Sequence, residues 1–137
     1  MFAITPETNL RRLALHESAH ALVALYHRLP IEFMSVRPED IGDDAVAGVV
    51  QYGRVDYDYR LADTFAAGIA TDGLHPWTEH DLKWVQMSSR HPVEVHVERA
   101  VEILRPMGMQ WTKLSDAILR EGRLSGDEVV GIVGSFA

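Results

Sequence analysis

Two histidines and a glutamate interrupt an apolar stretch near the start of the chain. They are His16, Glu17 and His20, within the segment LHESAHALV at positions 15–23. Burying such side chains in a helix core costs free energy unless other groups satisfy them. Side chains at positions i and i+4 of a helix project from the same face, so the two imidazoles can reach one ion. The spacing therefore predicts that His16 and His20 bind a metal.

The same spacing predicts what such a metal would do. Zinc binds neutral imidazole nitrogen at about 2.0–2.1 Å, and two histidines one helical turn apart fit that geometry. Glu17 lies about 100° round the helix from His16, beside the ion rather than on it. A general base must stand there to take a proton from a water whose pKa the metal has lowered towards about 7. The HExxH pattern is thus typical of a hydrolytic zinc centre with Glu17 as its base.

A catalytic zinc of this kind needs a third protein ligand and an open position. The extended pattern of the metzincins would place glycine at position 23 and histidine at position 26, where this chain has Val23 and Tyr26. His27 is one residue out of register. A third ligand must therefore come from farther along the chain. The candidates are Glu94, Glu98 and Glu102 in the segment 92–104, and the acidic residues and histidines of the segment 66–85.

Composition limits the other possibilities. A chain of 137 residues, 47% hydrophobic and 24% charged, is typical of one globular domain. Its net charge of -7 and scattered arginines argue against nucleic acid as a partner. Cysteine is absent, so only His, Asp and Glu remain as metal ligands. No run approaches the roughly 20 apolar residues that span a bilayer, and no signal peptide is recognisable, so we expect a cytoplasmic protein that does not enter a membrane.

The elements that must position these residues follow from the hydrophobic pattern. A long buried helix is expected from a start signal at residues 5–7 to about residue 27 or 28. Alternating residues predict strands over 31–38 and 45–53 around an acidic loop. Further helices are expected over 57–72, 78–89, 92–104, 112–121 and 125–133, the last with a capping box of Ser125 and Glu128. We therefore expect an α+β domain over 1–137, mostly helical, with a small front sheet and a C-terminal helical bundle.

Four stretches of the sequence resemble one known family. They read LHESAHALVALY, AAGIATDGL, WTEHDLKWV and LSDAILREGRLSGDEVVGIV, and they extend from about residue 10 to residue 133. In this order they resemble the peptidase domain of the FtsH-type ATP-dependent zinc metalloproteases, most closely at the HExxH and around Asp81. The resemblance implies a zincin-like fold with Zn2+ bound by His16, His20 and Asp81. Glu17 would be the catalytic base, and Asp72 stands where the family's AGRAAE-like element has its glutamate.

The chain also departs from that family. Ala19 replaces the glycine of HEAGH, and the segment 67–72, AGIATD, lacks the family's arginine. The AAA+ ATPase module and the membrane anchor of the family have no counterpart in this sequence. We therefore expect peptides or unfolded, flexible proteins as substrates, or action together with a separate partner protein.

Several residues keep a second interpretation. Asp81 also stands at the spacing of a capping box, so it could cap a helix instead of binding metal. His75 and His80 are rival third ligands nearby. Asp72 could accept the outer N–H of a ligand histidine and set its tautomer, or simply end a helix. The strand over 45–52 could bind an extended substrate or pack as an ordinary strand.

The sequence thus predicts a zinc-dependent metallopeptidase. The alternative is a non-catalytic zinc-binding protein with a structural or regulatory metal, although such a site has no use for Glu17. A helical module that binds a partner without metal is the third possibility. None of the motifs names the group that would stabilise negative charge on the substrate oxygen.

Overall fold

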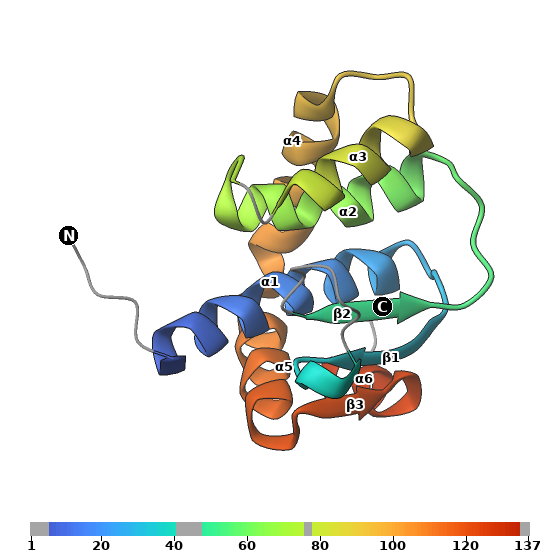
Figure 1. Cartoon of the computed structure of the whole chain (residues 1–137). Helices are drawn as coiled ribbons and strands as arrows, with labels where there is room; N and C mark the ends of the chain where they lie inside the picture. Colours follow the sequence, from blue (N-terminus) through green and yellow to red (C-terminus); the bar gives the residue numbers. More distant parts are fainter. Residues whose placement is uncertain (1–5, 41–47, 76–77, 135–137) are drawn as a thin grey trace.

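A long helix runs through the middle of the molecule. The computed structural model describes residues 6–40, 48–75 and 78–134, and these are mostly helical with a small sheet (Figure 1). Helix α1, Pro6–Tyr26, has three helices on one side, and the sheet with two more helices on the other. No helix in the described part is both long and apolar enough to cross a membrane. The helices after α1 are α2 (Tyr59–Asp72), α3 (Glu79–Ser88), α4 (Val93–Leu104), α5 (Gly108–Glu121) and α6 (Gly126–Val133).

Other elements cover helix α1 from both sides, which accounts for the apolar residues around most of its circumference. Ala19 and Leu22 have no exposed surface and share one core with residues of α2, α5 and the sheet. The predicted buried helix is therefore confirmed. It ends at Tyr26, ahead of the predicted residue 27 or 28, because Arg28 adopts a φ of 60° that turns the chain out of the helix.

Three short strands form an antiparallel sheet in the order β2-β1-β3. β1, Ile31–Ser35, lies between β2, Val49–Tyr52, and β3, Arg123–Ser125. Met34 of β1 is fully buried in the main core. In this strand order β2 is an edge strand, because β1 is its only strand neighbour among the described residues. The hydrophobic pattern does not predict β3, since three residues are too few to show alternation.

The two predicted strands are shorter than expected. β1 stops at Ser35, and a 3-10 helix, η1 (Pro38–Asp40), occupies the place where the prediction continues the strand and starts the acidic loop. β2 forms only the 49–52 part of the strand predicted over 45–53. Residues 45–47 and the rest of the acidic loop lie outside the described residues.

The helices after β2 do not form the single C-terminal bundle that the sequence predicts. α2, α3 and α4 pack together on one side of α1, whereas α5 and α6 lie with the sheet, because α1 separates the two groups. α5 begins at Gly108, before the predicted residue 112, since a 3-10 helix, η3 (Arg105–Met107), leads directly into it. The predicted capping box of Ser125 and Glu128 is confirmed.

A buried carboxylate joins the end of α1 to α2 and α4. Asp63 of α2 has no exposed surface. Its oxygens accept hydrogen bonds from His27 Nε2 at 2.9 Å, His96 Nδ1 at 2.7 Å and Arg99 Nε at 2.9 Å. Burial alone would raise the pKa of Asp63, but these three donors hold it below its usual value. The carboxylate therefore stays charged at neutral pH and fixes three helices together.

Asp63→Asn should destabilise the fold. The variant keeps the side-chain size but removes the charge that three donors share, and breaking a buried network from one side costs about 3–5 kcal/mol. Because folding lowers the pKa of Asp63, its contribution is present above the unfolded value of 3.8 and is lost as pH falls below it. Urea denaturation from neutral pH towards acid should show the difference in unfolding free energy between wild type and variant shrinking.

Asp116→Asn is the matched control. The Asp116 side chain is 53% exposed, and its ion-pair partner Arg11 lies 3.9 Å away. This change should alter the unfolding free energy by less than about 0.5 kcal/mol. An Asp63→Asn protein as stable as the control at neutral pH would contradict the role given to the buried carboxylate.

Candidate metal centre

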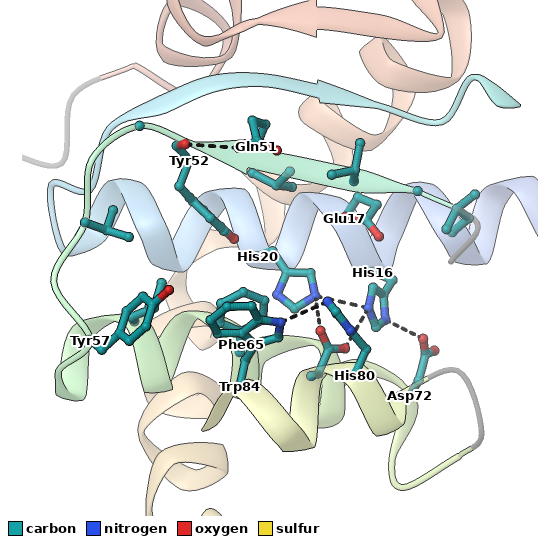
Figure 2. A pocket seen from close by; sticks show the side chains of 18 of the residues that line it. His16, Glu17, His20, Gln51, Tyr52, Tyr57, Phe65, Asp72, His80 and Trp84 are labelled. Carbon is teal, nitrogen blue, oxygen red and sulfur yellow. Dashed lines mark hydrogen bonds and ion pairs between the residues drawn. The ribbon is translucent and has the colours of Figure 1, made fainter. Parts of the chain in front are cut away.

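Two helices bring the predicted ligands together. His16 and His20 stand one turn apart on α1, and Asp81 lies in the first turn of α3. His16 Nε2 is 3.1 Å from both His20 Nε2 and Asp81 Oδ2, and His20 Nε2 is 3.2 Å from Asp81 Oδ1. The two imidazole rings lie edge to face, with 4.7 Å between their centroids (Figure 2). All three residues are buried, and one ligand atom of each lies within 4.8 Å of the others, so the group could hold a metal ion.

The outer nitrogens of both imidazoles are occupied, and this fixes the orientation of the two rings. His16 Nδ1 lies 2.7 Å from Asp72 Oδ2, and His20 Nδ1 lies 2.7 Å from the Thr64 carbonyl oxygen. Both oxygens accept, so each Nδ1 donates a proton outward and each Nε2 is turned toward the other ring and Asp81. The hydrogen bond predicted between Asp72 and a candidate ligand histidine is therefore present. The Nε2 atoms of His16 and His20 and the carboxylate of Asp81 therefore converge in the way that metal ligands do.

The electrostatics of the group favour a cation. Asp81 Oδ2 is fully buried and has no hydrogen-bond partner among the described residues. Burial by itself would lower the pKa of His16, but Asp72 and Asp81 raise it to about 10. Burial would likewise raise the pKa of Asp81, yet the two histidines bring it well below its usual value. The three groups thus attract positive charge, and a divalent cation fits them because it engages all three at once.

Gly68 makes room for the group on the α2 side. A Cβ atom at this position would lie 2.6 Å from His16 Cε1 and 2.8 Å from His16 Nε2, and it would also overlap Asp81. Only glycine lets α2 pass so close to the ligands. No local pattern in the sequence predicts this role of Gly68, because the two helices that approach each other here are far apart in the chain.

Glu17 lies on the strand side of the two imidazoles (Figure 2). It is 4% exposed and does not belong to the ligand group. Gly48, just before β2, packs against it, since a Cβ there would lie 2.7 Å from Glu17 Cγ. Burial raises the pKa of Glu17, although His20 and His16 oppose that effect. The predicted base is therefore beside the ligands and not one of them.

A cavity of about 370 Å³ opens at the ligand group and runs along β2. Glu17 and the three ligands line one end, and aromatic side chains line the other (Figure 2). Phe65 and Trp84 are stacked with 5.6 Å between ring centroids, and Phe65 also contacts the His20 ring at 5.8 Å. The sequence favours helix packing over substrate contact for Trp84 and shows no local pattern for Phe65, because β2, α2 and α3 bring the aromatic residues together only in the fold.

The rival ligands do not join the group in the part of the chain that the structure describes. His80 lines the cavity, but its Nε2 accepts a hydrogen bond from Trp84 Nε1 at 3.0 Å. Thr78, the N-cap residue of α3, makes no side-chain capping bond, so the predicted capping box around Asp81 is not formed. The other rivals lie away from the ligand atoms: His27 bonds Asp63, and His75, Glu94, Glu98 and Glu102 are exposed.

No protein-family model matches this sequence, and none of the curated proteins compared with it matches either. The resemblance to FtsH-type peptidase domains accordingly rests on the motifs quoted above. The candidate site rests on its own geometry, in which three buried ligand atoms meet beside Glu17.

Asp81→Asn should remove most of the metal affinity. Losing a partner outside the ligand set already costs about 10–100-fold, so losing a charged ligand should cost at least about tenfold. Protein purified without a histidine tag should carry one equivalent of divalent metal, and chelation should lower its melting temperature. Elemental analysis after dialysis, with thermal melts before and after chelation, measures both.

Glu79→Gln is the control for Asp81→Asn, because Glu79 lies in the same turn of α3 and is exposed. It should leave metal content and melting unchanged. Full metal content in Asp81→Asn after mild chelation, or its loss in His75→Ala instead, would show that the ligand set is wrong.

Proposed function

We propose that this protein is a zinc-dependent metallopeptidase with a zincin-like domain, similar to the peptidase domain of the FtsH-type metalloproteases. The observation that carries the proposal is the buried group of His16, His20 and Asp81 beside Glu17 in one cavity. Zinc takes imidazole nitrogen and carboxylate oxygen, and its catalytic sites have three protein ligands and one open position. The cavity beside the group leaves room for a peptide.

The side chains of the site have distinct tasks in this proposal. Zinc supplies a Lewis acid for a peptide carbonyl and lowers the pKa of a water molecule. Asp72 holds the His16 ring, and the Thr64 carbonyl holds the His20 ring, so both Nε2 atoms are turned toward the metal position. The Glu17 carboxylate takes the proton from the attacking water and passes it to the leaving amine. The raised pKa of Glu17, caused by burial, strengthens it as a proton acceptor.

The surroundings of the cavity favour an extended polypeptide as substrate. β2 is an edge strand, and residues 48–53 line the cavity. The free backbone groups of an edge strand can pair with an added strand. A segment that lies along β2 must be unfolded or flexible, so a folded protein would first need a separate partner to unfold it.

A non-catalytic zinc-binding protein is the alternative that the same ligands allow. Structural zinc sites are closed by four protein ligands. The group in the described residues has three ligand side chains. Glu17 lies beside this group but does not belong to it. These two observations favour the catalytic proposal.

Glu17→Gln should abolish most of the activity while leaving the metal in place. The amide keeps the size of the side chain but cannot accept a proton, and general acid–base catalysis contributes about 10²–10⁴-fold to the rate. Turnover of a fluorogenic casein and of peptide libraries measures the loss, and elemental analysis checks the metal. Glu98→Gln, on the exposed face of α4, is the control and should behave as wild type.

Two results would separate the proposals. A Glu17→Gln protein with full turnover on a substrate that the wild type cleaves would remove Glu17 from the mechanism. Metal-loaded wild type that cleaves no unfolded protein or peptide in the panel would favour the non-catalytic alternative.

A further inference from the structure

Tyr52 brings a hydroxyl group into the cavity from the sheet side. It is the last residue of β2, and it lines the cavity together with the ligands and Glu17. In Figure 2 its side chain leaves β2 and its hydroxyl points toward His20. Its ring packs edge-on against Phe65, with 5.9 Å between centroids, which limits how far the side chain can swing. The hydroxyl is thus held on the cavity wall opposite α2 and α3.

This hydroxyl is a hydrogen-bond donor that has no acceptor among the described residues. Residues 6–40, 48–75 and 78–134 offer it no hydrogen-bond partner, although the Tyr52 backbone carbonyl accepts a bond from Gln51 Nε2 at 3.4 Å. Burial, with the charges of Glu17 and Asp81, raises the pKa of Tyr52 well above 10. The phenol therefore keeps its proton at neutral pH. Tyr52 is half-buried, so its hydroxyl is open to a ligand that enters the cavity.

The other polar groups on the cavity wall are less suited to this task. Glu17, Asp72 and Asp81 are carboxylates and can only accept while ionised. The two ligand histidines turn lone pairs toward the metal position, and the Trp84 indole N–H is bonded to His80. His80 itself can donate from Nδ1, since its Nε2 accepts that bond, but it is an exposed side chain. Among the remaining lining residues, Gln51 Nε2 already donates to the Tyr52 carbonyl, and Tyr57 is 59% exposed. Arg12 also lines the cavity, so Tyr52 is compared with His80 and Arg12.

We propose that the Tyr52 hydroxyl donates a hydrogen bond to the carbonyl oxygen of the scissile peptide as that oxygen gains negative charge. The inference rests on the proposed peptidase function. The water oxygen bonds to the carbonyl carbon, the electron pair of the C=O π bond moves onto the carbonyl oxygen, and the water proton goes to Glu17. Tyr52 keeps its own proton throughout. The bond is strongest when the oxygen is charged, so it stabilises the transition state more than the bound substrate.

Tyr52→Phe tests the inference because it removes only the hydroxyl. Removing one donor to a developing oxyanion costs about 10²–10³-fold in kcat, and we expect a loss of that order with little change in KM. A phosphinic peptide, whose tetrahedral anion imitates the charged oxygen, should bind the variant more weakly by a similar factor in calorimetry. Metal content and melting temperature should match those of the wild type.

Tyr26→Phe is the matched control, since Tyr26 is a half-exposed tyrosine at the end of α1 outside the cavity. It should leave kcat, KM and phosphinic-peptide affinity unchanged. Unchanged kcat and affinity in Tyr52→Phe would overturn the inference, as would finding the entire loss in His80→Asn instead. If metal-loaded wild type neither cleaves peptides nor binds the phosphinic peptide, the proposed function fails, and the role of Tyr52 fails with it.

Discussion

The convergence of His16 and His20 on the Asp81 carboxylate links helices α1, α2 and α3 at the candidate site. The His16 and His20 Nε2 atoms and the carboxylate oxygens lie 3.1–3.2 Å apart in a buried place, where such groups are stable only when they share a positive charge. Asp72 fixes one ring from outside, so α2 must approach α1 closely. Gly68 permits that approach, because any larger residue would enter the space of His16.

The two sides of α1 make different contributions to the cavity. α2 and α3 supply a ligand and the groups that orient the histidines, whereas the sheet supplies the surroundings of Glu17 through Gly48 and the hydroxyl of Tyr52. A peptide lying along β2 would therefore have Glu17 and the Tyr52 hydroxyl on its sheet side and His16, His20 and Asp81 on its helix side. The buried carboxylate of Asp63 holds α2 and α4 against the end of α1 and takes no part in the candidate metal group.

The parts of the site that sequence reasoning predicts are those carried by local spacing. His16 and His20 lie one turn apart on a single helix, so their meeting follows from helix geometry alone. Asp81 comes from a different helix and was reached through the resemblance of short motifs. The close approach at Gly68 and the inward hydroxyl of Tyr52 could not be predicted, because both depend on how distant elements pack. The three-residue strand β3 and the division of the later helices into two groups could not be predicted for the same reason.

The central claim is that His16, His20 and Asp81 together hold one divalent metal ion. Anomalous diffraction at the zinc absorption edge, from crystals of protein purified without a histidine tag, tests it most directly. We predict one peak about 2.0–2.2 Å from both Nε2 atoms and from a carboxylate oxygen of Asp81. A peak held by other side chains, or no peak between these three residues in crystals grown with zinc, would contradict the account.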